Sequence, residues 1–168
     1  ACSMLRLADA KCLAGCSGMV LDYAAREPFW RRNLNYNHGT GHGVGYLGNI
    51  HEAPIGFRWK ATRDAMCEIE PGMVITDEPG IYIEGSHGIR IENELLVCAG
   101  EKNEYGQFLY FEPLTFVPID LDALRPELMT EEEKQLLNAY HQSVYEKISP
   151  YLEAEEKEWL KEYTRPVK

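Results

Sequence analysis

The sequence contains no run of about 18 apolar residues, which is the length that a helix needs to cross a bilayer. It is also poor in basic residues, because 17 lysines and arginines stand against 27 acidic residues, for a formal net charge of −10. A surface that binds nucleic acid requires the opposite balance. We therefore expect neither membrane association nor a nucleic-acid partner.

Cysteines are scarce and scattered. The five of them, Cys2, Cys12, Cys16, Cys67 and Cys98, are odd in number, and no paired CxxC zinc pattern is present. Cys12 and Cys16 have the spacing of one helix face, but no further ligand completes a zinc site. The pattern favours free thiols in a reducing compartment. We therefore expect a cytoplasmic protein.

The length of 168 residues and the hydrophobic content of 45% suffice for one ordinary domain with its own core. The sequence begins with Ala1 instead of Met and enters helical periodicity at once. We expect the chain to be a segment of a larger protein.

The residue pattern predicts helices at both ends and strands between them. The second helix is expected to place Asp22 and Arg26 outward, and a capping box formed by Thr130 and Glu133 is expected to open the third. A proline after Ser149 predicts the start of the last helix. The expected helices are 3–13, 19–32, 130–148 and one from 149, and the expected strands are 37–46, 55–60, 73–78, 81–83, 89–97 and 109–117.

Residues 37–54 hold the densest chemistry in the chain. They contain three of the five histidines, His38, His42 and His51, and five of the fourteen glycines. Glycine at alternate positions removes side chains and allows backbone or a ligand to approach closely. Imidazoles in such surroundings can serve as metal ligands or proton carriers. A single histidine here would be unremarkable, but three together indicate a functional site.

Two carboxylates lie downstream on the arms of a predicted hairpin. With the turn near Gly85, Glu78 and Glu92 come out opposite each other or one pair apart, and opposed Cβ atoms are roughly 4.5–5.5 Å apart. Like charges at that distance repel unless they share a proton or a metal ion. Arg90 offers the alternative of a simple ion-pair cluster.

A histidine together with two carboxylates makes a hard, oxygen-rich ligand set. Such a set suits manganese, iron, cobalt or zinc better than copper. Carboxylates that can bridge favour two ions close together, an arrangement that activates water for hydrolysis.

Three motifs, in this order, closely resemble the Xaa-Pro aminopeptidases (aminopeptidase P). They are His-Gly-Thr-Gly-His-Gly-Val-Gly with His-Glu-Ala-Pro in residues 38–54, Thr-Asp-Glu-Pro-Gly-Ile-Tyr in 76–82, and Gly-Ile-Arg-Ile-Glu-Asn in 88–93. The segment 111–115 before the helical tail is similar to the long, multidomain branch. These enzymes are pita-bread metallopeptidases, so the resemblance implies an α+β fold: a curved, mainly antiparallel sheet with helices on its outer face.

The resemblance also implies a ligand set. His42, Glu78 and Glu92 would be metal ligands, with Glu92 bridging two divalent ions. Manganese is the metal that the resemblance favours, and zinc, cobalt and iron are alternatives.

Further roles follow by position in the same motifs. His51 and His38 would be catalytic residues that bind substrate and support or shuttle protons around the reacting carbonyl. Tyr82 and Arg90 would orient the ligands. The implied reaction releases an N-terminal residue that precedes proline, so the expected substrate is a peptide with proline in the second position.

The chain departs from the family pattern upstream of His38. The family's metal site also needs two aspartates, and neither Asp9 nor Asp22 matches that motif. We therefore expect residues 1–118 to be the C-terminal half of a pita-bread catalytic domain and 119–168 a helical extension packed on it.

Such a segment would carry three of the five metal ligands and would be inactive without the missing N-terminal half. The helical extension would suit a homodimer, as in the long branch. Two other hypotheses remain at this point: a non-catalytic pita-bread module that binds peptides or proteins, and a mononuclear hydrolase built from three ligands.

Overall fold

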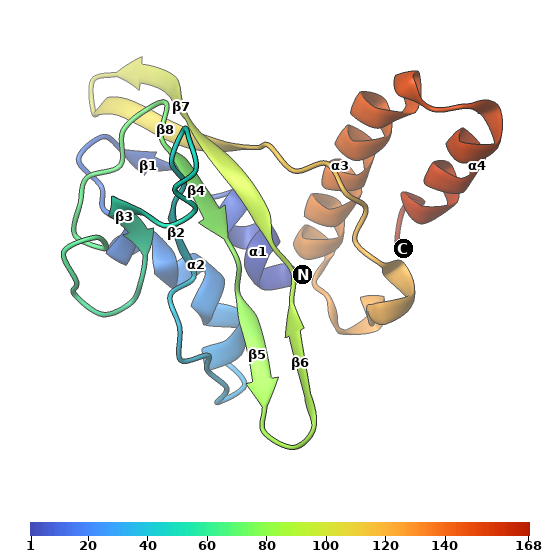
Figure 1. Cartoon of the computed structure of the whole chain (residues 1–168), viewed down its shortest axis with the longest axis horizontal. Coiled ribbons are helices and arrows are strands. Elements are labelled where there is room, and N and C mark those ends of the chain that lie inside the picture. The colour runs from blue at the N-terminus through green and yellow to red at the C-terminus, as the bar shows by residue number, and fades with distance from the viewer.

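The computed structural model describes all 168 residues of the chain. Two helices and a short strand come first, seven strands follow, and the longest helix lies in the C-terminal part of the chain among short 3₁₀ turns (Figure 1). The helices are α1 (Cys2–Ala8), α2 (Gly18–Trp30), α3 (Glu131–Ile148) and α4 (Ala154–Tyr163), and the strands are β1 (Cys12–Leu13), β2 (Gly41–Gly43), β3 (Glu52–Phe57), β4 (Val74–Asp77), β5 (Gly80–Ile83), β6 (His87–Arg90), β7 (Asn93–Asn103) and β8 (Gly106–Pro113).

Six strands form one antiparallel sheet in the order β1-β8-β7-β4-β2-β3. Strands β5 and β6 pair separately and prolong β4 and β7 into a long two-stranded arm (Figure 1). Helices α1 and α2 pack together and against the sheet. The prediction of an α+β fold with a mainly antiparallel sheet is confirmed. None of the helices combines the length and apolar character that crossing a membrane requires.

The buried apolar side chains form two clusters that meet at α1. The first lies between the sheet and helices α1 and α2, and includes Leu7, Phe57 and Ile75. The second lies among the C-terminal helices, and Met4 and Leu5 of α1 belong to it. The short first helix therefore contributes to both cores.

Strand boundaries differ from the sequence-based expectation at several places. Cys12 and Leu13 do not continue the first helix, because they pair with the free edge of β8 instead, Cys12 opposite Leu109. The strand expected over 37–46 shrinks to three residues. Residues 89–97 are not one strand, since pairing stops between Arg90 and Asn93, and Ile89 is exposed on the arm.

The capping-box prediction at Thr130 is confirmed, because its side chain accepts from the Glu133 amide and Glu133 reaches back to the Thr130 amide. The predicted start of the last helix is wrong. Ser149 opens only a 3₁₀ turn, and α4 begins after Glu153, whose own capping box with Glu156 satisfies the free amides.

The expected outward orientation of Asp22 and Arg26 on α2 is also wrong. Both residues are completely buried. They form an ion pair with each other, with 2.5 Å between Arg26 Nε and Asp22 Oδ2. Pairing is what makes their burial tolerable, because an isolated buried charge is strongly unfavourable.

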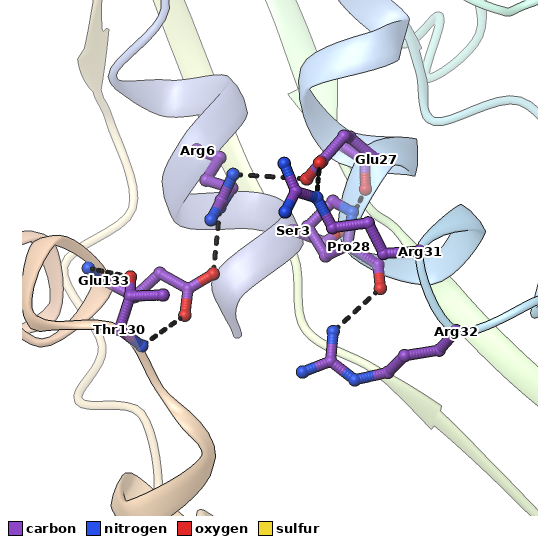
Figure 2. Close-up of polar contacts among 9 residues, drawn as sticks. Ser3, Arg6, Glu27, Pro28, Arg31, Arg32, Thr130 and Glu133 are labelled. Carbon is purple, nitrogen blue, oxygen red and sulfur yellow. Dashed lines mark hydrogen bonds and ion pairs between the residues drawn. The ribbon is translucent and has the colours of Figure 1, made fainter.

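One arginine connects three helices (Figure 2). Arg6 of α1 contacts Glu27 of α2 at 3.3 Å and Glu133 of α3 at 2.9 Å. The other carboxylate oxygen of Glu133 accepts from the Thr130 amide at 2.9 Å. Burial opposes ionisation of Glu133, but the Thr130 amide and the Arg6 guanidinium outweigh it and lower the pKa of this carboxyl. The contacts fasten the C-terminal helices to the rest of the chain.

We expect Glu133→Gln to lower the free energy of unfolding at neutral pH by about 1–2 kcal/mol, because it weakens hydrogen bonds to a charged group. A carboxyl with a lowered pKa stabilises the fold above its ordinary pKa of 4.5 and loses that contribution as the pH falls below it. The difference between variant and parent should therefore shrink in acid. Urea unfolding across pH measures it, with the exposed Glu132→Gln as control; an equal effect of both substitutions would contradict the assignment.

Candidate metal and catalytic site

The register of the two-stranded arm places Glu78 and Glu92 opposite each other. The β4–β7 and β5–β6 ladders keep the same register on either side of the two glutamates, and strand pairing is interrupted between the ladders. Pro79 contributes to the interruption, since it has no amide hydrogen to donate. The two flanking pairs are Asp77 with Asn93 and Gly80 with Arg90.

Arg90 lies between the two carboxylates. Its Nε is 3.0 Å from Glu92 Oε2, and its Nη1 is 4.0 Å from Glu78 Oε2. A hydrogen bond with Tyr82 and the charge of Glu92 raise the pKa of Arg90, so the guanidinium stays charged. Repulsion between the glutamates is thus relieved by a cation on the same arm, which is the ion-pair alternative considered above.

His42 is the histidine that reaches the carboxylates. Its Nε2 is 3.2 Å from Glu78 Oε1, while its Nδ1 lies 2.9 Å from the carbonyl oxygen of Gly43. A carbonyl can only accept, so Nδ1 carries a proton and donates it. Thr76 links His42 to Glu78. Its hydroxyl accepts a hydrogen bond from the His42 amide and donates one to Glu78 Oε1, both at 3.0 Å.

This pair has the chemistry of half a metal site. Because Nδ1 is directed to the Gly43 carbonyl, Nε2 is the nitrogen that faces the Glu78 carboxylate, and both groups can donate an electron pair to one cation. A divalent cation suits that arrangement. The structure nevertheless gathers no group of three or more histidine, cysteine or acidic side chains able to hold a metal ion. Glu92 contacts Arg90 instead.

The other two histidines of the glycine-rich stretch flank this pair. The His51 ring lies 4.3 Å from the His42 ring between centroids, and its side chain is exposed. The His38 ring lies between two tyrosines, 4.9 Å from Tyr36 and 5.5 Å from Tyr82. All three histidines therefore lie close to the base of the arm.

The glycines of the stretch allow close contact between strands. A Cβ atom on Gly41 would lie 1.8 Å from the carbonyl oxygen of Thr76, and one on Gly43 would lie 2.4 Å from that of Glu52. Larger residues would push β2 away from β4 and β3. The alternate glycines thus set the distance between His42 and Glu78.

Two residues of the site escaped the sequence analysis. Thr76 could have been found from its position two residues before Glu78, which places both side chains on one face of a strand. Asp77 is completely buried, and neither carboxylate oxygen has a partner. Burial, opposed by the terminal amine of Ala1 and reinforced by Glu78 and Glu92, raises the pKa of Asp77 well above its ordinary value. Nothing in its local sequence signals that environment.

Solved structures share this architecture. The chain resembles the crystal structure of an X-prolyl aminopeptidase from Caenorhabditis elegans, described as a cytosolic enzyme with a di-nuclear active site, with a TM-score of 0.87 and 36% identity. The match covers 98% of this chain and 27% of that one. A Xaa-Pro dipeptidase from Bacillus anthracis matches with a TM-score of 0.54 and 33% identity, over 71% of this chain and 29% of that one.

The curled antiparallel half-barrel sheet with its outer helices has the architecture of the pita-bread fold. Residues 3–99 match the family described as metallopeptidase family M24, and residues 107–167 match the C-terminal region of peptidase M24. The chain belongs to metallopeptidase family M24. The resemblance to the Xaa-Pro aminopeptidases noted in the sequence is confirmed.

Curated relatives carry the name Xaa-Pro aminopeptidase P. A probable Xaa-Pro aminopeptidase P of Ajellomyces dermatitidis is 43% identical over 159 residues, which is 91% of this chain and 25% of the relative. One of Talaromyces marneffei is 45% identical over 161 residues, 92% of this chain and 24% of the relative. The chain thus spans about a quarter of the length of these relatives.

Proposed function

We propose that this chain forms the C-terminal half of the catalytic domain of a dinuclear Xaa-Pro aminopeptidase, which releases an N-terminal residue preceding proline. The contact between His42 Nε2 and Glu78 Oε1 at 3.2 Å carries the proposal, because it turns an imidazole and a carboxylate toward one point. The names of the relatives and the di-nuclear site of the Caenorhabditis elegans enzyme support it.

His42, Glu78 and Glu92 would contribute ligands to two divalent metal ions. Manganese is the proposed metal, and zinc, cobalt or iron would fit the same donors. When bound, the ions would supply Lewis acidity and a nucleophile derived from water. Arg90 keeps Glu92 in place beside Glu78 and limits the repulsion between them, as its 3.0 Å contact indicates.

His51 and His38 are the proposed catalytic histidines. The exposed ring of His51 packs against His42, where it can contact a peptide and exchange a proton with it. His38 Nε2 lies 3.3 Å from the Gly80 carbonyl, which aims the ring toward the arm. Tyr82 flanks His38 and also contacts Arg90, so that Tyr82 and Arg90 together orient the neighbouring groups.

The remaining ligands would come from a preceding half-domain, since the chain spans about a quarter of its curated relatives. Residues 1–118 would then be the second half of the catalytic domain and 119–168 a helical extension, available for a homodimer. The chain alone would be inactive. A cytoplasmic location fits the Caenorhabditis elegans enzyme, which is described as cytosolic.

The proposal can be tested with a joined protein, in which the upstream half of the catalytic domain is fused before residue 1 of this chain. With manganese it should release the first residue of a peptide with proline in the second position, and the same peptide with alanine there should be cleaved far more slowly. The chain alone should bind manganese more weakly than micromolar and cleave neither peptide. A joined protein that binds manganese but spares the proline peptide would overturn the proposal.

A further inference from the structure

The inner face of α2 carries a buried ion pair that the reaction does not use directly. Asp22 and Arg26 are one helical turn apart, and neither side chain has any exposed surface. Burying both charges costs free energy, and apolar residues of similar volume often stabilise a core as well. The pair therefore calls for an explanation other than stability.

Arg26 is bonded along the segment that leads to His38. Its Nη1 donates to the carbonyl oxygen of Tyr36 at 2.8 Å and to the side chain of Asn35 at 2.9 Å. Its Nη2 donates to the carbonyl oxygen of His38 at 2.7 Å. The guanidinium carbon lies 3.9 Å from the centre of the Tyr36 ring, which in turn packs against the His38 imidazole.

Asp22 holds the far end of the same segment. Its Oδ1 accepts from the Thr40 hydroxyl at 2.5 Å, and that hydroxyl is also 2.5 Å from the phenol oxygen of Tyr36. The carbonyl oxygen of Thr40 accepts from the Glu78 amide at 2.7 Å. Side chains of α2 thus fix the backbone on both sides of His38. The chain of hydrogen bonds continues through Thr40 to the amide of Glu78.

We propose that Asp22, Arg26 and Thr40 are positioning residues: they hold the His38 backbone and the Glu78 amide, just beyond the end of β4, in the geometry that catalysis requires. The proposal rests on the proposed function for its catalytic consequence. Its structural part stands on the contacts alone, because buried donors and acceptors that lose a partner force their neighbours to rearrange. A fixed geometry matters here because misplacement by about 1 Å can cost about 10²-fold in rate.

The sharpest test is a matched pair of substitutions at Thr40, which is fully buried. Thr40→Val keeps the shape and removes the hydroxyl that joins Asp22 to Tyr36, whereas Thr40→Ser keeps the hydroxyl. In the full chain, we expect Thr40→Val to shift the ring resonances of His38. Hydrogen exchange at the Thr40 and Glu78 amides should accelerate about tenfold or more, as loss of one charge-assisted hydrogen bond allows. Thr40→Ser should restore both readouts.

A general loss of stability must be separated from this effect. Val144→Ala in the C-terminal core serves as the control, because Val144 is fully buried but lies in the other hydrophobic cluster. Urea concentrations are chosen so that Val144→Ala and Thr40→Val are equally close to unfolding. If Val144→Ala moves the His38 resonances as much as Thr40→Val does, or if Thr40→Val moves nothing, the positioning role is wrong.

A measurement of activity provides a second test. In the joined protein with manganese, Thr40→Val should reduce kcat about 10- to 100-fold with KM changed less than about threefold, and Thr40→Ser should recover most of the loss. An unchanged kcat in Thr40→Val would overturn the proposal. If the unsubstituted joined protein is inactive, the proposed function fails, and the resonance and exchange measurements still decide whether Thr40 positions His38.

Discussion

Replacing His42 with alanine is expected to lower kcat/KM of the joined protein on a proline peptide by about 10³-fold or more. Metal ions supply several kcal/mol of transition-state stabilisation, and each 1.36 kcal/mol is tenfold in rate. His42 is the proposed nitrogen ligand, and its Nε2 faces Glu78 at 3.2 Å. Peptide release at saturating manganese measures the loss, and calorimetric titration should show weaker manganese binding.

The matched control is His87→Ala. His87 lies on the exposed arm, where Nδ1 contacts only the Ser86 hydroxyl, and it has no assigned role. We expect its activity to stay within about twofold of the parent, as for most surface substitutions. Full activity in His42→Ala would remove His42 from the metal site, and an equal loss in both variants would point to a general defect.

The second large effect concerns stability. Arg26→Met should lower the free energy of unfolding by about 3–5 kcal/mol, because it leaves the Asp22 carboxylate buried without its cation. Urea unfolding followed by circular dichroism measures the change in midpoint. The double variant Asp22→Leu with Arg26→Met removes both charges and should lose less than the single variant.

Arg32→Met is the surface control for that series, since Arg32 lies just beyond the end of α2 and contacts only the Pro28 carbonyl. Its unfolding free energy should change by less than about 0.5 kcal/mol. If Arg26→Met were equally mild, the buried pair would be energetically independent of its surroundings, contrary to the hydrogen bonds it makes.

Local patterns predicted part of the fold correctly. The turn residues around Gly85 limited the register of the arm to two neighbouring alternatives, because the pairs in an antiparallel hairpin follow from its turn, and the structure has the one with Glu78 opposite Glu92. The capping box of Thr130 and Glu133 is likewise a local interaction, complete within four residues. Features that depend only on near neighbours in the chain are readable in this way.

Features that depend on distant partners were missed. Charge alone placed Asp22 and Arg26 on the surface, whereas their partners lie on the segment from 35 to 40, which folds back over α2. The break opposite Pro79, between Arg90 and Asn93, was not expected, because the alternating pattern of residues 89–97 predicted one continuous strand. The roles of His42, Glu78 and Glu92 came from the resemblance, because spacing alone left an ion-pair cluster open.

The seven residues of α1 have a consequence for how the chain can be divided. Leu7 belongs to the core under the sheet, while Met4 and Leu5 belong to the core of the C-terminal helices. Arg6, between them, links the acidic side chains of α2 and α3. A shortened chain that begins after α1 would uncover apolar surface on both sides at once. The regions 3–99 and 107–167 therefore both pack on α1, although they follow each other only once along the sequence.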